Sequence, residues 1–331
     1  MEKLRCSIVG LGRVASLLEE DALREKPCTH AGAVDADAEC VLAGGCDLDE
    51  ERCRLFASRW PGVQVSRDFE AMMASSRPDI LHIATPPDTH LDLVGRALAC
   101  GVRVLVCEKP LAENSREAEE IVRLVRREKA KLLVNHERRY SRDYLSARRR
   151  LAAGFFGRLL TVSARLCFGR TRPATDVLLH DGTHLLDIIR FLTAADLSVA
   201  GAESIRHAGE ETLMISARAG EAPLWIEVGT GRDYVVFELD LSCSQGRLRI
   251  GNGLYEEQVS GPSPYYEGMR SLKKTPARRP LRTGYFAQML SDAVRCVREP
   301  AHQPRSEAAD GLAAMLFIDE VKSLLRAAKR S

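Results

Sequence analysis

The sequence of 331 residues predicts two domains, a doubly wound parallel α/β sheet followed by a domain on an open, mostly antiparallel sheet. Two observations predict the first domain. Short apolar runs alternate with helical segments over residues 4–134, and the first run ends in a glycine-rich turn. After residue 136, strand-like segments separated by Gly-rich turns replace this alternation, which predicts the second domain. The predicted domains are therefore residues 1–136 and 137–331.

The composition predicts an ordinary soluble globular protein. Forty-eight basic and 46 acidic residues leave a net charge of +2, so no surplus of positive charge favours nucleic acid or an anionic membrane as a partner. The N-terminal segment has no signal-peptide pattern, and no run of about 18 apolar residues could cross a membrane. The ten cysteines are scattered without a C-x-x-C pair, which predicts reduced thiols and no zinc site in a cytoplasmic protein.

The first predicted strand, residues 4–9, leads into a glycine-rich segment at residues 10–15. Its pattern, G-x-G-x-x-A, is typical of a dinucleotide-binding turn, in which the first glycine makes a tight turn and the second lets a pyrophosphate approach the backbone. We expect a helix to follow directly, so that its free N–H groups bind the phosphates. Residues 24–39 are interpreted as a loop insertion after that helix. The predicted cofactor contacts of the turn are Gly10, Leu11, Gly12, Arg13 and Val14.

An acidic residue, Asp47, directly follows the second predicted strand at residues 40–46. A carboxylate at this place accepts hydrogen bonds from both hydroxyls of an adenosine ribose and repels a 2′-phosphate. The sequence therefore favours NAD as the cofactor. Arg13 and Arg52 keep NADP as the alternative, because arginine side chains bind phosphate.

Strands and helices keep alternating through the rest of the first domain. Apolar, β-branched runs predict strands, and apolar residues three and four positions apart predict helices. Six strands joined by crossover helices form a doubly wound parallel sheet, the Rossmann arrangement. The further predicted strands are residues 63–65, 79–84, 102–107 and 132–134, and the predicted helices are residues 49–59, 68–74, 91–100 and 115–129.

Two strand ends carry candidate site residues, because ligands of open α/β sheets bind beyond the carboxyl ends of the strands. Residues 84–90 form a turn with two prolines, rigid enough to shape a slot for adenine or for the nicotinamide ribose, with a plain loop as the alternative. Its predicted cofactor contacts are Ala84, Thr85, Pro86 and His90. The other strand end is Glu108-Lys109-Pro110, whose lysine is either a catalytic group restricted by the proline or a surface lysine before a turn.

The second domain contains a histidine-rich segment at residues 180–184, with Asp187 beyond it. On a helix His180 and His184 share a face, and Asp187 lies about one turn further on. A histidine beside a carboxylate can transfer a proton near neutral pH. Two other roles stay open: the histidines could bind a metal, although no third ligand is in view, or they could satisfy a buried helix start.

Alternating apolar and polar residues predict antiparallel strands elsewhere in the second domain, with one face on a core and one more polar face. The predicted strands are residues 159–168, 213–217, 224–229, 235–241 and 247–250, and a helix is predicted over residues 306–326. Basic patches at residues 148–150 and 273–279 lack interleaved aromatic residues and are interpreted as solvated surface.

The ordered motifs resemble the glucose-fructose oxidoreductase, inositol dehydrogenase and MocA (Gfo/Idh/MocA) family along nearly the whole chain. The motifs are G-L-G-R-V-A at 10–15, C-D at 46–47, A-T-P-P at 84–87, E-K-P at 108–110 and D-G-T-H-L-L-D at 181–187. The resemblance implies a Rossmann domain that binds NAD(P), with Glu108, Lys109 and Arg138 among its contacts. It further implies that Lys109 hydrogen-bonds the reacting oxygen and that His184 is the general acid or base.

One position departs from the family pattern, because His180 stands where an aspartate or asparagine is usual. Either His180 or the adjacent Asp181 then takes the second polar role in the catalytic group.

The first functional hypothesis is an NAD(P)-dependent oxidoreductase that transfers a hydride at a carbinol carbon of a sugar, sugar acid or polyol. A cofactor-sensing regulatory protein on the same fold is the alternative from another class. A reductase of a dihydrodiol or an imine is the alternative among enzymes. The resemblance also implies a homodimer or homotetramer formed through the polar face of the second-domain sheet.

Overall fold

The computed structural model describes residues 2–169, 172–276 and 285–328. The chain forms two compact units, Met1–Tyr140 with Thr283–Leu312, and Ser141–Arg282 with Ala313–Ser331. The predicted boundary after residue 136 falls four residues before the change of unit at Tyr140. The prediction also assigned residues 283–312 to the second domain, whereas the structure groups them with the first unit.

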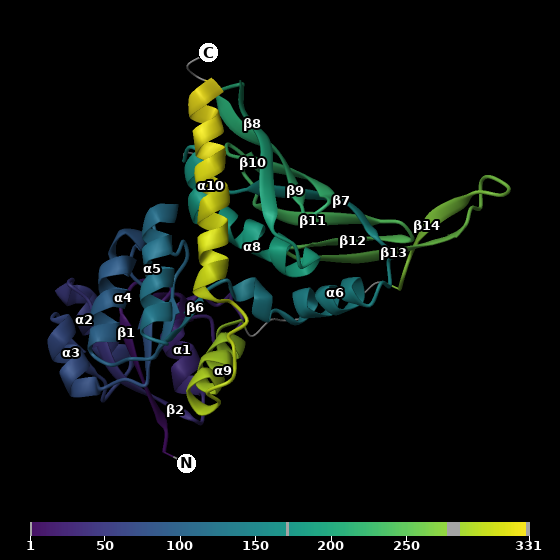
Figure 1. Cartoon of the computed structure of the whole chain (residues 1–331). Helices are drawn as coiled ribbons and strands as arrows, with labels where there is room; N and C mark the ends of the chain where they lie inside the picture. Colours follow the sequence, from purple (N-terminus) through teal and green to yellow (C-terminus); the bar gives the residue numbers. More distant parts are fainter. Residues whose placement is uncertain (1, 170–171, 277–284, 329–331) are drawn as a thin grey trace. The chain divides into compact units, whose positions relative to one another are not determined.

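The first unit is built on a six-stranded parallel sheet with the order β3-β2-β1-β4-β5-β6 (Figure 1). This order confirms the predicted doubly wound Rossmann sheet, because the chain runs from β1 outward to β3 and then from β4 outward on the other side. The central strands are buried on both faces, as their continuous apolar runs predict. The strands are β1 (Leu4–Val9), β2 (Cys40–Cys46), β3 (Gln64–Ser66), β4 (Ile80–Ile83), β5 (Val104–Cys107) and β6 (Lys131–Val134).

The helices of this unit begin where polar side chains cap their free N–H groups. Asp49 accepts from the N–H groups of Glu51 and Arg52, and Asp68 and Asn114 make equivalent caps for the helices that follow them. The α-helices are α1 (His30–Ala36), α2 (Glu50–Arg59), α3 (Phe69–Ser76), α4 (His90–Ala99), α5 (Ser115–Arg127) and α9 (Tyr285–Arg298); the 3₁₀ helices are η1 (Leu17–Glu20), η2 (Pro87–Thr89) and η3 (Glu137–Tyr140).

The helix expected directly after the glycine-rich turn is interrupted. After Ala15 the chain forms a turn and η1, and α1 begins only at His30, so the prediction of an insertion after the helix is wrong. The N–H groups of His30 and Ala31 donate to the carbonyl oxygens of Val14 and Ala15 at 3.2 and 2.9 Å. These bonds place α1 as if it continued directly from the turn, and residues 16–29 form a loop beside its start.

This inserted loop is tied to the N-terminus of α1 by one carboxylate. Glu19 Oε2 accepts from the hydroxyl of Thr29 at 2.6 Å and from the N–H of Cys28 at 3.1 Å. The Thr29 hydroxyl oxygen in turn accepts from the N–H of Gly32 at 3.0 Å and caps the helix. A carboxylate is favoured here because free N–H groups and the helix dipole make the N-terminus positive.

Helix α9 covers part of the parallel sheet, although it lies far along the chain. Its residues Phe286, Met289 and Leu290 belong to one buried cluster with Ile80 of β4 and Val106 of β5. Apolar residues three and four apart give α9 a single buried stripe. The first unit therefore closes one face of its sheet with a C-terminal segment of the sequence.

Asp292 of α9 anchors this segment through three hydrogen bonds. It accepts from the Tyr140 hydroxyl at 2.9 Å and the Arg305 N–H at 2.8 Å, and it lies 2.6 Å from His302 Nε2. Tyr140 and Asp292 are both buried.

We expect Asp292→Ala to lower the free energy of unfolding by about 3 kcal/mol, because it leaves several buried donors without an acceptor. The matched variant Tyr140→Phe removes one of the bonds and is expected to cost about 1 kcal/mol. Urea unfolding of the two variants measures both values. Equal losses for the two variants would show that Asp292 contributes no more than its bond to Tyr140.

The second unit is built on an eight-stranded sheet with the order β14-β13-β12-β11-β7-β10-β9-β8. All neighbours are antiparallel except β7 and β10, which confirms the predicted open, mostly antiparallel sheet. The prediction missed β8, β13 and β14. The strands are β7 (Leu159–Cys167), β8 (Leu197–His207), β9 (Glu210–Ala219), β10 (Ala222–Gly229), β11 (Val236–Cys243), β12 (Gly246–Gly251), β13 (Leu254–Pro262) and β14 (Arg270–Lys274).

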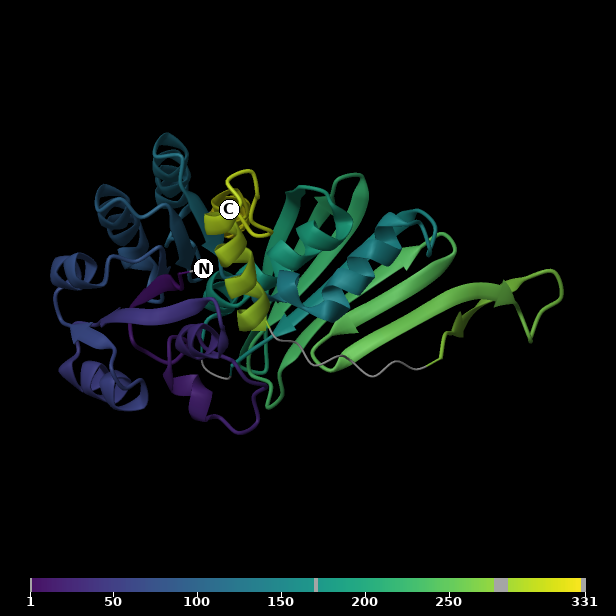
Figure 2. The ribbon, with the colours of Figure 1, turned by 90° about the horizontal axis from the view of Figure 1, so that it is seen from below.

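Helices cover one face of this sheet (Figure 2). Helix α7 (Ala174–His180) packs on β9 and β10, and α8 (Gly182–Thr193) packs on β7 and β9. Helix α6 (Arg142–Ala152) packs against α8, and the long C-terminal helix α10 runs over Ala308–Ala328. Among the described residues, no helix is both long enough and apolar enough to span a membrane.

Candidate functional site

A cavity of about 680 Å³ opens at the carboxyl ends of β1, β2 and β4 in the first unit. This is the edge where doubly wound sheets bind their ligands. Six predicted cofactor contacts line the cavity, namely Gly10, Gly12, Asp47, Ala84, Thr85 and Pro86. The remaining residues of the glycine-rich turn do not line it in the same way: Leu11 is buried, Val14 is half-buried and Arg13 is exposed.

The two glycines of the turn are required for different reasons. Gly10 has a φ of +84°, and a Cβ atom there would lie 2.7 Å from the backbone of Ala84. Gly12 has ordinary backbone angles, and a Cβ atom there would meet only Arg52 Nη1 at 4.0 Å. The space over Gly12 is thus open on the cavity side, as the approach of a pyrophosphate requires. The turn fits a dinucleotide.

Asp47 is held by the turn that it faces. Its Oδ2 accepts from the N–H of Leu11 at 2.8 Å, its Oδ1 accepts from the N–H of Asp49 at 2.9 Å, and Arg52 Nη1 lies 3.5 Å from Oδ2. Asp47 itself is only 9% exposed. A carboxylate fixed in this way can accept the hydroxyls of an adenosine ribose, while Arg52 stands ready to bind a phosphate.

Asp47 is therefore expected to set the cofactor preference. An Asp47→Ser variant removes the charge that repels a 2′-phosphate and frees Arg52, so the ratio of NADPH to NADH affinity should rise by about 100-fold. Calorimetric titration with each cofactor measures this ratio. Asp49→Ser is the matched control, because Asp49 also lies within 3.7 Å of Arg52 but caps α2, a role that serine can fill. An unchanged ratio in Asp47→Ser would contradict this assignment.

Sequence reasoning missed three residues on the adenosine side of the cavity, Arg67, Phe69 and Arg96. The Arg96 guanidinium lies 4.6 Å from the centre of the Phe69 ring. Arg67 directly follows β3, which pairs with β2. The available signal was the parallel order of the sheet, because it places the end of β3 beside Asp47 at the end of β2.

The proline-containing turn after β4 presents its backbone rather than His90 to the cavity. The His90 side chain is buried, and its two ring nitrogens lie 3.1 and 3.0 Å from the carbonyl oxygens of Leu111 and Thr85. Burial lowers the pKa of His90, which favours the neutral ring. His90 therefore supports the turn from the protein interior. Because its side chain is fully buried, the structure does not place it where a cofactor could contact it.

The end of β5 carries Glu108 and Lys109, the predicted centre of the site. Glu108 is 7% exposed and its Oε1 lies 2.9 Å from His30 Nε2, with the side-chain amide of Asn135 donating to the same oxygen. Burial raises the pKa of Glu108, but its bonds to His30 and Asn135 and the charge of Lys109 outweigh burial and leave the pKa below the ordinary value. Glu108 is therefore a carboxylate. Lys109, and Arg138 on η3, are half-buried.

The inserted loop lies close enough to Glu137 for the charge of Arg24 to lower the pKa of the Glu137 carboxyl. Burial raises the pKa of Glu137, the charge of Glu108 raises it further, and the charges of Arg138, Lys109 and Arg24 lower it. Arg24 belongs to the loop of residues 16–29. Arg24 of the inserted loop and Lys109 thus both lie near Glu137 within the first unit.

The predicted acid-base residues of the second unit lie at the junction of two helices. His180 ends α7, Asp181 separates the helices, and His184 lies in the first turn of α8. The prediction that both histidines share the face of one continuous helix is wrong, because Asp181 interrupts it. The Asp181 carboxylate forms an ion pair with Arg172 at 2.5 Å, which the sequence did not indicate. Both histidines are half-buried, and Asp187 is buried.

A metal centre receives no support from the part of the chain that the structure describes. No group of three or more His, Cys, Asp or Glu side chains there could hold a metal ion. The ten cysteines are free thiols.

Comparisons with known proteins agree with this geometry. A family model described as an oxidoreductase family with an NAD-binding Rossmann fold matches residues 4–136. An inositol 2-dehydrogenase of Rhizobium meliloti (strain 1021) is 26% identical over 249 residues, which cover 75% of this chain and 67% of that protein. The matches to the next relatives span only 38% and 37% of their lengths.

Solved structures match nearly the whole chain. A dehydrogenase from Chromobacterium violaceum has a TM-score of 0.81 with 18% identity and covers 99% of this chain and 97% of its own. An oxidoreductase from Agrobacterium radiobacter, solved with NAD+, L-tartaric acid and magnesium, has a TM-score of 0.74 with 19% identity and covers 98% and 96%. At this level of identity the likeness shows the fold alone.

Proposed function

Because the chain belongs to the Gfo/Idh/MocA oxidoreductase family, whose Rossmann fold binds NAD, we propose that it is an NAD(P)-dependent dehydrogenase of a sugar, sugar acid or polyol. The observation that carries this proposal is the cavity beside Gly10, Gly12 and Asp47, at the edge of the sheet where Glu108 and Lys109 also lie. The inositol 2-dehydrogenase among its relatives supports a polyhydroxylated substrate.

The proposed roles follow from the chemistry of each side chain. NAD, when bound, supplies the acceptor for the hydride of the carbinol carbon. The Lys109 ammonium donates a hydrogen bond to the reacting oxygen and stabilises its developing negative charge. His184 takes the proton of the substrate hydroxyl. Either His180 or Asp181 supplies the second polar contact, and the Asp181 carboxylate also pairs with Arg172.

The test is NADH formation from NAD+ with a panel that contains myo-inositol, aldoses, sugar acids and small 2-hydroxy acids. Substrate-dependent NADH production supports the proposal. Tight NADH binding without turnover on any member of the panel would instead support a cofactor-sensing protein.

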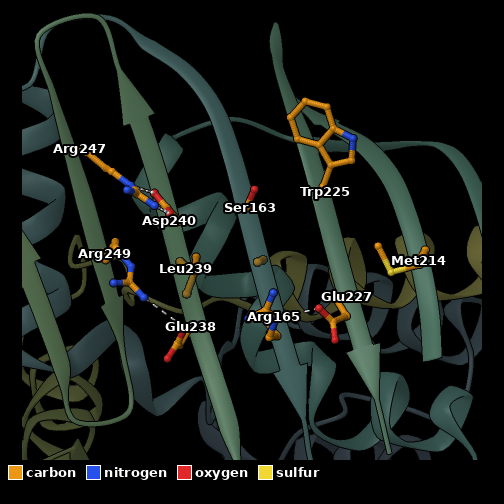
Figure 3. A pocket seen from close by; sticks show the side chains of 11 residues that line it. Ser163, Arg165, Met214, Trp225, Glu227, Glu238, Leu239, Asp240, Arg247 and Arg249 are labelled. Carbon is orange, nitrogen blue, oxygen red and sulfur yellow. Dashed lines mark hydrogen bonds and ion pairs between the residues drawn. The ribbon is translucent and has the colours of Figure 1, made fainter. Parts of the chain in front are cut away.

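We further propose that the open face of the second-unit sheet binds a second copy of the chain. Cross-strand ion pairs lie on this face, between Arg165 and Glu227 at 2.7 Å and between Arg247 and Asp240 (Figure 3). Trp225 stands among them with 47% of its surface exposed. Because the charges are already compensated within one chain, a second copy meets a neutral face with an aromatic anchor, the kind of surface enriched in interfaces.

Trp225→Glu is therefore expected to convert the oligomer to a monomer, because it places a charge at the centre of the buried patch. Light scattering coupled to size-exclusion chromatography measures the mass. The control is Tyr265→Glu, which adds the same charge at an aromatic residue that is 81% exposed in the turn between β13 and β14. Wild-type protein that runs as a monomer would contradict the interface.

A further inference from the structure

A chain of four buried polar side chains runs beneath the carboxyl ends of the parallel strands. His82 lies on β4, His30 on α1, Glu108 follows β5 and Asn135 follows β6. The Nδ1 atoms of His82 and His30 are 3.0 Å apart, and His30 Nε2 lies 2.9 Å from Glu108 Oε1. The exposed fractions of the two histidines are 0%, and that of Asn135 is 3%. Burying polar side chains costs free energy, so such groups are rare in a core unless hydrogen bonds compensate for the lost contact with water.

The hydrogen-bonding pattern defines the direction of the chain. A carboxylate only accepts, so His30 Nε2 carries the hydrogen that faces Glu108. With that tautomer, His30 Nδ1 accepts from His82 Nδ1, and His82 Nε2 is a bare lone pair. This agrees with the structure, in which His82 Nε2 is buried without a hydrogen bond. Burial lowers the pKa of His82 well below its ordinary value, so His82 is neutral.

Both donors converge on one oxygen of Glu108. His30 and Asn135 bond Oε1, whereas Oε2 takes no hydrogen bond from the described residues. The Glu108 side chain keeps 10% of its surface exposed. One oxygen is therefore clamped from below, and the other is left for a ligand or for the neighbouring Lys109.

The inserted loop does not displace His30 from Glu108, because α1 resumes next to the glycine-rich turn after the insertion. His30 is the first residue of α1, and its N–H bonds Val14 across the insertion. Phe286 of α9 packs edge-on against the His30 ring, with 5.2 Å between the ring centres. The imidazole is thus oriented by elements from three separate parts of the sequence.

We propose that His30 and Asn135 are positioning residues, which hold the Glu108 carboxylate so that its Oε2 and the adjoining Lys109 face the nicotinamide side of the cofactor. This inference rests on the proposed function, since it assumes that Glu108 and Lys109 serve a bound NAD. The ligand atoms that suit Oε2 are the hydroxyl donors of the nicotinamide ribose.

The test uses NADH as the probe and needs no knowledge of the substrate. Glutamine places its amide nitrogen near His Nε2, and asparagine places its own near Nδ1, so His30→Gln keeps the donor to Glu108 and His30→Asn loses it. We expect the Kd for NADH to rise about 10-fold in His30→Asn and to stay within about threefold in His30→Gln at pH 7. Asn135→Ala removes the other donor and gives the same test if His30→Asn does not fold.

A pH profile separates positioning from a merely structural effect. The groups that face Glu108 are His30 from α1, Asn135 after β6, Lys109 and Cys107 beside it in sequence, His90 from α4 and Glu137 from η3. His30→Asn removes the main group that lowers the pKa of Glu108, so NADH affinity should begin to fall at a higher pH than in wild type. Phe286→Leu is the packing control, expected to lower thermal stability without moving this acid limb.

The outcomes separate this inference from the proposed function. Wild-type NADH affinity and an unmoved acid limb in folded His30→Asn and Asn135→Ala would overturn the positioning roles. If these variants behave as expected but Lys109→Ala keeps full turnover, the catalytic assignment fails and the clamp on Glu108 stands. Absence of NADH binding by the wild-type protein would overturn both.

Discussion

A Lys109→Ala variant is expected to lose turnover by about 100-fold to 10,000-fold, because no ammonium group then stabilises negative charge on the reacting oxygen. The Kd for NADH should stay within about threefold, since Lys109 is not among the residues that line the cavity proposed to hold the adenosine and pyrophosphate. Steady-state rates with the substrate found in the panel, and calorimetric titration with NADH, measure the two quantities separately.

This split between turnover and binding distinguishes a catalytic lysine from a surface lysine before a turn. Lys3→Ala removes an equally cationic but exposed side chain of the same unit and controls for a general loss of charge. Full turnover in Lys109→Ala would refute the assignment. A parallel loss of NADH affinity would make Lys109 a cofactor ligand instead.

The parallel sheet was predictable because each of its strands is a short apolar run bounded by polar residues. β5 and the run of residues 102–107 agree in this way, and the helices begin at side chains such as Asp49 and Asn114 that cap them. Helix α9 carries the apolar stripe of a helix, but its place on the sheet depends on contacts between Phe286 and residues some 200 positions earlier, such as Ile80. No local pattern encodes such a partner.

The site residues likewise divide into those that a local motif predicts and those that only contacts between distant segments bring together. Gly10, Gly12 and Asp47 could be predicted from the sequence, because a tight turn and a ribose contact each need one residue type at the end of a strand. The clamp on Glu108 was hidden, because His30 and Asn135 come from elements more than 100 residues apart in the chain. The inserted loop added to the difficulty, since only the bonds from His30 and Ala31 back to the glycine-rich turn reveal where the helix resumes.

Alanine at the two glycines of the turn is expected to affect two different quantities, the free energy of unfolding at Gly10 and the affinity for NADH at Gly12. Gly10→Ala places a Cβ atom 2.7 Å from the backbone of Ala84 at a φ of +84°, where side chains are strained. We expect the free energy of unfolding to fall by about 3 kcal/mol, even without cofactor. Gly12→Ala meets only the end of the flexible Arg52 side chain at 4.0 Å, so its free energy of unfolding should stay within about 0.5 kcal/mol of wild type.

For the affinity for NADH, Gly12→Ala is the informative variant of the two. The Cβ atom of Gly12→Ala stands in the space that a pyrophosphate needs, so the Kd for NADH should rise at least about 10-fold in a protein that is otherwise intact. Urea unfolding and NADH titration of both variants test this. A Gly12→Ala protein that binds NADH as wild type does would mean that no pyrophosphate approaches this turn, and the cofactor would then have to enter the cavity by another route. A Gly10→Ala protein of unchanged stability would show that the backbone beside Ala84 can move aside, and the rigid turn could no longer be the reason for glycine there.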